Sequence, residues 1–378
     1  MKKRLGDYIK EYSVRNKENQ DIPVYSVTNT EGFCQDYFGK EVASKDKSTY
    51  KIVPQGYFAY NPSRINVGSV DWQRTQERVI VSPLYNVFSV SDKLDQQYLY
   101  YYLKSDFVLQ RIKAVATGSV RDNLKLKMLY EFPINIPELS SQKNIVELLD
   151  KIKKIEGVKK AELDYFDTLV KARFVEMFGN PNEINKIANA QIKDVASVKV
   201  GIVIKPTQFY SDDKTGKCAF RSLNIIPFGV KKNSEWVYFT DAAMSENKRT
   251  IVHEGDLLIV RSGNPGTCCV VPREYDGCNV IDLIIAHPDN SKILPEYLCA
   301  FTNMPHGMNQ INNQQHGVAQ RHFNVSMYEK MKLYVPKLSM QHQFVDFMIR
   351  ADKSKVAIQK SLDETQILFQ SLMQKYFG

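Results

Sequence analysis

Basic and amide side chains in loop-rich stretches are the residues of this sequence whose types could do chemistry, and that chemistry is the binding of a polyanion. Lys and Arg can bind phosphates, while Arg, Lys, Asn and Gln can also hydrogen-bond the edges of nucleic-acid bases. The sequence has 51 Lys and Arg against 42 Asp and Glu, a net charge of +9. This excess suits a polyanion, although charge alone also fits a soluble basic protein without such a partner.

The candidate nucleic-acid contacts form one set in each half of the chain. Those of the first half are Lys45, Lys47, Lys51, Arg64, Asn66, Arg74, Arg78 and Arg121. Those of the second half are Lys199, Lys205, Arg221, Arg261, Ser262, Asn264, Gln320 and Arg321. A solvated surface charge is the alternative interpretation of each Lys and Arg.

Motifs for catalysis are weak along the whole chain. The Asn-Pro pairs at Asn61, Asn180 and Asn264 all lack the second proline of the NPPY motif, which adenine methyltransferases use to bind the target amino group. No G-x-G-x-x-G or Walker A sequence is present. We therefore expect no catalytic residue here, with a stand-alone DNA methyltransferase or nuclease of unusual motif as the alternative.

Metal-binding and membrane-spanning patterns are also missing from the sequence. The six Cys residues include no C-x-x-C pair and the six His residues no H-E-x-x-H, so we expect reduced thiols and no metal site. The longest apolar run, VIDLIIA at residues 280–286, is too short to span a bilayer. These features predict a cytoplasmic protein.

The chain contains an internal repeat with an offset of 199 positions. The phrase FPINIPELSSQ, residues 132–142, matches MKLYVPKLSMQ, residues 331–341, and its proline and glutamine each recur 199 positions later. The same register, without gaps, brings Gly56 onto Gly255. Such agreement over a long span predicts a tandem duplication.

The rear part of each repeat predicts a long helix with a coiled-coil seam, because apolar residues recur there in alternating steps of four and three. The apolar seam residues are Ile145, Leu149, Ile152, Leu163, Phe166 and Val170 in the first repeat, and Phe344, Met348, Ile358, Leu362, Phe369 and Leu372 in the second. Glu156 and Lys159 interrupt the first seam. We expect the helices to pair with each other, antiparallel, although packing of each on its own domain is an alternative.

The front part of each repeat has short β-rich runs between Gly and Pro turn signals. Residues 98–117 predict an added helix in the first repeat, and their counterpart, with Pro305, a less regular one. The predicted fold is α+β, with two α/β domains separated by the helical pair and related by a pseudo-two-fold axis. The predicted division is 1–135 and 181–334 for the domains and 136–180 and 335–378 for the helical segments.

A doubled pattern connects these elements to a known family. GSVRDNL and GVAQRHF are each followed by a hydrophobic stretch, P-x-L-x-x-Q and a long helix. This arrangement resembles the specificity subunit of type I restriction-modification enzymes. The stretch SKDKSTYKIVPQGYFAYNPSRINVGS is similar to a common kind of target-recognition domain in that family, and the resemblance covers nearly the whole chain.

The resemblance implies a DNA-recognition subunit without catalytic residues. Each target-recognition domain would read one half of a split site in double-stranded DNA, and the helices would set the spacing and dock two methyltransferase (M) subunits. Motor-nuclease (R) subunits would join through the assembled complex. S-adenosylmethionine and ATP would be used by these partners and no cofactor by this chain. A DNA-independent interaction scaffold is the remaining alternative.

Overall fold

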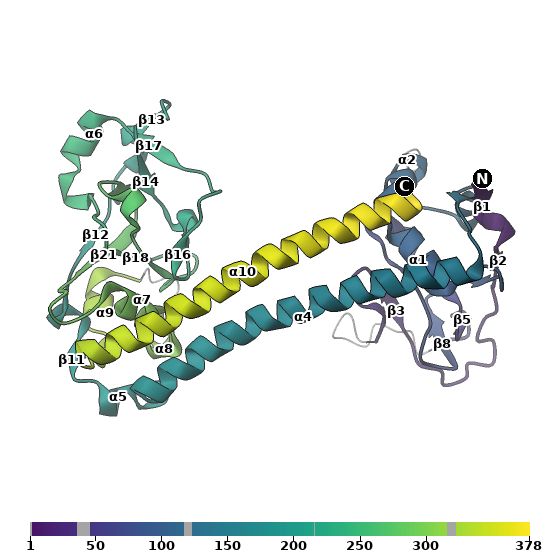
Figure 1. The fold of residues 1–378 in the computed structure, drawn as a ribbon, viewed down its shortest axis with the longest axis horizontal. Helices are drawn as coiled ribbons and strands as arrows, with labels where there is room; N and C mark the ends of the chain where they lie inside the picture. The colour runs from purple at the N-terminus through teal and green to yellow at the C-terminus, as the bar shows by residue number, and fades with distance from the viewer. Residues whose placement is uncertain (1, 36–45, 117–122, 215, 316–322) are drawn as a thin grey trace. The chain divides into compact units, whose positions relative to one another are not determined.

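The computed structural model describes residues 2–35, 46–116, 123–214, 216–315 and 323–378. The chain forms two compact units: unit 1 comprises Met1–Ala161 and Ile358–Gly378, and unit 2 comprises Glu162–Ala357. Each unit therefore contains part of both long helices, α4 (Leu139–Phe178) and α10 (Leu338–Phe377) (Figure 1). The boundary between the two compact units falls within the long helices, so it does not test the predicted division of each repeat into a domain and a helical segment at residues 135, 180 and 334. That division stays a prediction.

Unit 1 combines antiparallel strand pairs with three short helices on its globular part. Its central sheet has the strand order β2-β9-β6-β7. Its strands are β1 (Lys3–Arg4), β2 (Ile9–Glu11), β3 (Ser26–Thr28), β4 (Gly32–Cys34), β5 (Lys51–Pro54), β6 (Phe58–Tyr60), β7 (Val70–Trp72), β8 (Arg78–Val81), β9 (Asn86–Val90) and β10 (Pro133–Ile134). Its short helices are α1 (Gln96–Lys104), α2 (Asp106–Ala116) and α3 (Leu126–Tyr130).

Unit 2 has a sheet of the same kind, with the order β12-β21-β18-β19, and a second four-stranded sheet, β13-β17-β14-β20. Its strands are β11 (Ala190–Gln191), β12 (Ala196–Val200), β13 (Tyr210–Ser211), β14 (Lys217–Phe220), β15 (Ile225–Ile226), β16 (Gly229–Val230), β17 (Val237–Phe239), β18 (Leu257–Val260), β19 (Cys268–Val270), β20 (Asn279–Val280), β21 (Leu283–Pro288) and β22 (Lys332–Leu333). Its short helices are α5 (Ile184–Ile187), α6 (Asp241–Glu246), α7 (Pro295–Asn303), α8 (Pro305–Gln315) and α9 (Val325–Glu329).

The secondary structure repeats at the 199-residue offset found in the sequence. Helices α1, α2, α3 and α4, and strand β10, have the same bounds as α7, α8, α9, α10 and β22 after that shift. Gly56 and Gly255 both have positive φ, +82° and +89°, which glycine adopts without the steric cost of a Cβ. The α+β fold class with an internal repeat is confirmed.

The expectation of one helix over residues 98–117, and of a less regular counterpart, was wrong. Both repeats contain two helices, and the break falls at Ser105 in the first and at Met304 in the second. Pro305 is the first residue of α8, where its missing N–H has no intrahelical partner to lose. The proline therefore starts a regular helix and disturbs none.

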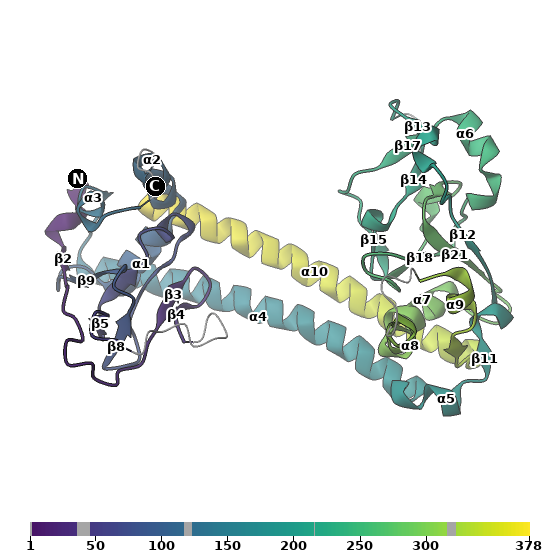
Figure 2. The same ribbon diagram turned by 180° about the vertical axis from the view of Figure 1, so that it is seen from behind.

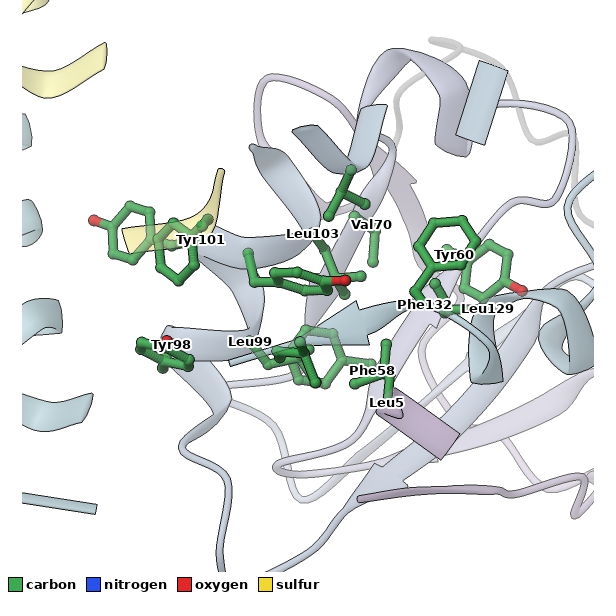
Figure 3. Close-up of a cluster of buried hydrophobic side chains, with 14 of the residues drawn as sticks. Leu5, Phe58, Tyr60, Val70, Tyr98, Leu99, Tyr101, Leu103, Leu129 and Phe132 are labelled. Carbon is green, nitrogen blue, oxygen red and sulfur yellow. The ribbon is translucent and has the colours of Figure 1, made fainter. Parts of the chain in front are cut away.

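The core of unit 1 lies between the central sheet and helices α1 to α3. Figure 3 shows Phe58 and Tyr60 of β6 gathered with Leu99 of α1, and all three side chains are buried. The Tyr60 hydroxyl donates to the carbonyl of Leu124 at 3.1 Å, so the buried phenol has a partner.

A fully buried glutamine fixes the start of helix α4 to the rest of unit 1. Gln142 is 0% exposed, and its Oε1 accepts a hydrogen bond from the N–H of Asp95, the N-cap of α1, at 2.9 Å. Its Nε2 donates to the carbonyls of Lys93 at 3.0 Å and Pro137 at 2.8 Å. One side chain thereby satisfies three backbone groups and joins the first turn of α4 to the segment before α1.

Unit 2 repeats this junction at every position. Gln341, also 0% exposed, accepts from the N–H of Leu294 at 2.8 Å and donates to the carbonyls of Lys292 at 3.0 Å and Pro336 at 2.9 Å. All four residues lie 199 positions after their unit 1 counterparts. The P-x-L-x-x-Q pattern is therefore a structural joint between globular part and long helix.

The predicted seam residues of both helices are buried or half-buried. Leu149, Ile152, Phe344, Leu362 and Phe369 are buried. Half-buried are Ile145, Leu163, Phe166, Val170, Met348, Ile358 and Leu372. Within unit 1 the segments of α4 and α10 run antiparallel (Figures 1 and 2). Lys159 of α4 contacts Ser361 of α10, whereas Lys153, six residues earlier in α4, lies over the ring of Phe369, eight residues later in α10. The same burial pattern continues in the helical segments of unit 2.

The polar interruption of the first seam is satisfied inside unit 1. The Lys159 ammonium donates to the carbonyl and hydroxyl of Ser361 at 2.9 and 2.7 Å, and to the Thr365 hydroxyl at 2.7 Å. Glu156, 6% exposed, accepts from Lys153 Nζ at 3.0 Å. A satisfied polar residue at a seam position selects one register of the two helices, because any shift would leave it unpaired.

The last turn of each long helix completes the core of the other repeat. In unit 1, Phe377 of α10 packs on Tyr98 of α1, with ring centres 5.0 Å apart. In unit 2, Phe178 of α4 packs on Tyr297 of α7, also at 5.0 Å. The pairs are again 199 positions apart, so each compact unit is built from both repeats.

We expect Gln142→Met to lower the free energy of unfolding of unit 1 by about 2–4 kcal/mol, because it leaves a buried N–H and two carbonyls without their partner. Trp72 lies in unit 1 and Trp236 in unit 2, so a Trp236→Phe background lets fluorescence-monitored denaturation follow unit 1. Lys143→Met, at the exposed next position, is the control and should change little. Equal effects of the two substitutions would contradict the structural role of Gln142.

Phe369→Asp should destabilise unit 1 by about 3–5 kcal/mol, since it removes a buried ring and introduces a charge into the seam. The neighbouring Leu368 is 50% exposed against 7% for Phe369, which makes Leu368→Asp a matched control. Chemical denaturation of both variants in the same background would measure the difference. A destabilisation by Leu368→Asp as large as that by Phe369→Asp would show that the seam is wrongly assigned.

Candidate nucleic-acid interface

In unit 1, the loops that carry candidate contacts leave the central sheet at one edge. Tyr60, the last residue of β6, pairs with Val70, the first of β7, and with Asn86, the first of β9. The β6–β7 loop, residues 61–69, and the loop before β9, residues 82–85, therefore emerge together. We call this end of the sheet the loop edge of unit 1.

A pocket of about 390 Å³ opens among the loops at this edge. Hydroxyl, amide and aromatic groups dominate its lining, and Arg64 is the one cation among the described residues that line it. The polar lining residues are Tyr25, Ser26, Thr28, Asn29, Thr30, Tyr50, Asn61, Arg64, Ser69, Ser82 and Tyr85. Such a surface can donate and accept hydrogen bonds and can stack on a planar group, which are the contacts that bases make.

Arg64 and Asn66, two of the candidate contacts, lie at this edge in the β6–β7 loop. Arg64 is exposed, and its guanidinium has no partner among the described residues. Arg64 is the last residue of the turn that leads from β6 into the 3-10 helix Ile65–Val67, and Asn66 lies within that helix, which is followed by Gly68 with a positive φ of +86°. The turn holds Arg64 at the pocket while leaving its five donors for a ligand.

Lys47 and Lys51 are near the same edge, but their charges have partners in the protein. Lys51 Nζ donates to the carbonyl of Tyr85 at 2.6 Å, and burial lowers the pKa of Lys51, partly offset by Glu11. Lys47 Nζ lies 3.6 Å from a carboxylate oxygen of Asp21. Lys51 thus supports the loop before β9, and Lys47 keeps a weak, solvent-accessible ion pair.

Arg74 and Arg78 lie at the other end of the strands from the pocket. Arg74 follows β7, where its Nη1 donates to Asp71 at 2.7 Å and its guanidinium lies 4.5 Å from the ring centre of Trp72. Arg78 is exposed at the start of β8 and pairs in the ladder with Pro54. The structure therefore does not bring these two arginines together with Arg64.

Unit 2 presents an equivalent loop edge. Val260, the last residue of β18, pairs with Leu283, the first of β21, while Val200, the last of β12, pairs with Ile284. Cys268, the first residue of β19, pairs with Ile259 of β18. The loops after β12 and between β18 and β19, residues 261–267, consequently share this edge, and the second loop corresponds to the β6–β7 loop of unit 1.

Four of the candidates in unit 2 lie at or beside that edge. Lys199 is exposed on β12, and Lys205 is exposed in the loop that follows, with a left-handed φ of +44°. Asn264 is exposed in the β18–β19 loop, and Ser262 is half-buried there. Their types and exposure suit contacts to phosphates and base edges.

Arg261 and Arg221 are largely held by the protein itself. Arg261 donates through Nε to the carbonyl of Phe323 at 3.2 Å and through Nη1 to Asp282 at 2.5 Å. Arg221 Nη2 donates to the carbonyl of Glu235 at 3.1 Å, while its buried Nε has no partner among the described residues. Arg261 thus fixes the base of the β18–β19 loop.

Four candidates, Lys45, Arg121, Gln320 and Arg321, lie outside the residues that the structure describes. The pocket also contains residues that the sequence did not single out, above all Thr28, Asn29 and Asn61. Thr28 and Asn29 belong to the β3–β4 hairpin, whose signal was the polar Asn-Thr-Glu-Gly turn between two strand-like runs.

The described parts of the chain show two further negative findings. Among them, no group of three or more His, Cys, Asp or Glu side chains is arranged to hold a metal ion. None of the described helices has both the length and the apolar character of a membrane span.

Comparison with known proteins connects this geometry to one family. The model of the type I restriction modification DNA specificity domain matches the chain twice, at residues 3–165 and 186–366. A protein of Haemophilus influenzae, provisionally assigned as a type I restriction enzyme specificity subunit, is 25% identical over 280 residues, which cover 70% of this chain and 66% of that relative. The match thus spans just under two thirds of the relative's length.

Two solved structures have a similar fold. One, from work on complex assembly and conformational transition of a type I R-M system, has a TM-score of 0.66 at 15% identity and covers 100% of this chain and 97% of its own. The type I restriction-modification S subunit from M. genitalium has a TM-score of 0.55 at 14% identity, with 100% and 96% covered. Because the family model matches both repeats over most of their length, this chain belongs to the type I restriction-modification DNA specificity family.

Proposed function

We propose that this chain is the DNA-recognition subunit of a type I restriction-modification complex and that each unit reads one half of a bipartite site in double-stranded DNA. The observation that carries the proposal is the pair of equivalent loop edges, one per unit, each at the same end of a four-stranded antiparallel sheet. Exposed polar groups gather at both edges, and the chain carries a net charge of +9. Loops on a rigid scaffold suit base reading, because their sequence can vary without loss of the fold.

The residues at the two edges differ, which suits two different half-sites. Unit 1 offers a polar pocket with Arg64 at its margin, whereas unit 2 offers Lys199, Lys205 and Asn264 on open loops. Arg can contact guanine with two hydrogen bonds and Asn can contact adenine in the same way. Equivalent scaffolds with different loop chemistry would read different sequences.

Catalysis would reside on partner subunits. Two M subunits, docked on α4 and α10, would use S-adenosylmethionine, and R subunits in the assembled complex would use ATP. Both long helices have solvent-exposed apolar residues outside the seam, such as Val158, Tyr165 and Val356, which are 51%, 63% and 64% exposed. Exposed apolar side chains of this kind are available for protein contacts.

The proposal is tested by selecting duplexes from a random DNA library with the purified complex of this chain and its M subunits. We expect two short enriched motifs separated by an unread gap of constant length. One continuous motif, or no enrichment over random duplex, would contradict the proposal. As a control, the chain alone with labelled S-adenosylmethionine and the selected DNA should transfer no methyl group, and transfer would favour a stand-alone methyltransferase.

Arg64→Ala should weaken binding to the selected duplex by about tenfold or more and relax the preference at one position of a single half-site, because each good base contact contributes about 1–3 kcal/mol. Arg74→Ala is the matched control. It removes the partner of buried Asp71, so it should lower the thermal stability of unit 1 while the selected motif stays the same. An unchanged motif and affinity for Arg64→Ala would exclude Arg64 as a base contact.

A further inference from the structure

The β15–β16 hairpin of unit 2 presents an apolar turn beside the loop edge. Ile226 pairs with Gly229, so Pro227 and Phe228 form a two-residue turn. The N–H of Phe228 donates to the carbonyl of Cys268 at 2.9 Å, and Cys268 is the first residue after the β18–β19 loop. The hairpin tip is thereby fixed next to that loop, and Figure 2 shows β15 close to β18 in this unit.

Phe228 has a backbone conformation that its side chain disfavours. Its φ is +64°, in the left-handed region that glycine and asparagine adopt most easily, and a bulky residue there is strained. The ring gains little from burial in return, since the residue is 45% exposed. Ile225 is buried in the core and anchors the hairpin, so the aromatic ring at the tip is not needed to hold it.

The equivalent hairpin of unit 1 shows that the scaffold does not require an apolar tip. Strands β3 and β4 pair through Thr28 and Gly32, and the tip between them consists of Asn29, Thr30 and Glu31. The backbone carbonyl and side-chain oxygen of Asn29 both accept from Lys104 Nζ, at 2.9 and 3.1 Å. Unit 1 therefore has a polar tip bound to its own domain, whereas unit 2 has an apolar one open to solvent.

We propose that Phe228, supported by Ile226 and Pro227, is a wedge that inserts against the bases of duplex DNA and opens a stacked base step in the half-site read by unit 2. This inference rests on the proposed function and adds a mode of reading to it. Base faces are the principal apolar surfaces of DNA, and proteins that deform the duplex insert Phe, Ile or Pro between base steps. A step that unstacks easily would be preferred, so the wedge would contribute to sequence choice through deformability.

The charges around the tip favour DNA over a protein partner. Lys231 is exposed directly after β16 and has no ion-pair partner among the described residues, while Lys232 binds Glu274 at 2.7 Å. An unpaired cation beside the wedge can bind a phosphate next to the opened step. A stable protein interface needs about 800 Å² from each partner, far more than a two-residue turn provides.

The wedge is tested with the complex of this chain and its M subunits on the selected duplex, with 2-aminopurine placed at successive steps of the half-site of unit 2. The fluorescence of 2-aminopurine rises when it unstacks. We expect wild-type complex to raise it at one step. Phe228→Gly, which removes the ring and suits the positive φ, should abolish that rise and weaken binding by about tenfold or more.

Controls separate the wedge from folding, from partner docking and from the proposed function. Phe228→Gly should keep or raise the melting temperature, and Leu223→Ala, at an exposed apolar site just before the hairpin in the same unit, should leave the fluorescence rise intact. A Phe228→Gly complex with unchanged affinity and fluorescence would overturn the wedge. A Phe228→Gly chain that binds DNA like wild type but no longer binds the M subunits would also overturn it. If the wild-type complex selects no bipartite site, the proposed function itself fails and the wedge with it.

Discussion

The buried amide of Gln142, and of Gln341 in the second repeat, is the interaction on which the architecture of both units depends. Each glutamine is fully buried and hydrogen-bonds three backbone groups. An apolar residue in its place would leave those three backbone groups without a hydrogen-bond partner. Since the partners precede α1 or α7, the direction in which each long helix leaves its globular part is fixed by hydrogen bonds. Hydrophobic packing alone would allow more than one angle.

A second constraint follows from the exchange of helix ends. Phe377 completes the core of unit 1 and Phe178 that of unit 2, so neither repeat forms its core from its own residues alone. Near the helix ends, the predicted seam residue Leu372 of α10 and Met177 of α4 are half-buried, while Met373 and Phe178 are buried. The most buried position shifts because the final turns pack into a globular core as well as along a partner helix.

The two units share their secondary-structure scaffold but differ in the loops at their loop edges. The helices of the scaffold are repeated to the residue, as shown by the common bounds of α1 and α7 or of α3 and α9. The loops at the edges are not, and a polar pocket in unit 1 corresponds to an apolar hairpin tip beside open loops in unit 2. A duplicated scaffold can therefore carry two recognition chemistries, because the loops contribute little to either core.

The sequence by itself determined the repeat, its register, the α+β class and the seam of the long helices, because periodicity and the 199-residue offset are properties of the chain in order. Only the tertiary structure decided which charged residues are available. Arg64 and Arg74 look alike in the sequence, yet Arg74 and Arg261 are bound by buried or strand-end acceptors while Arg64 is exposed. It also decided the role of Lys159, whose three acceptors come from residues about 200 positions away. Pairing, burial and backbone strain such as that of Phe228 depend on distant neighbours, and no local pattern records them.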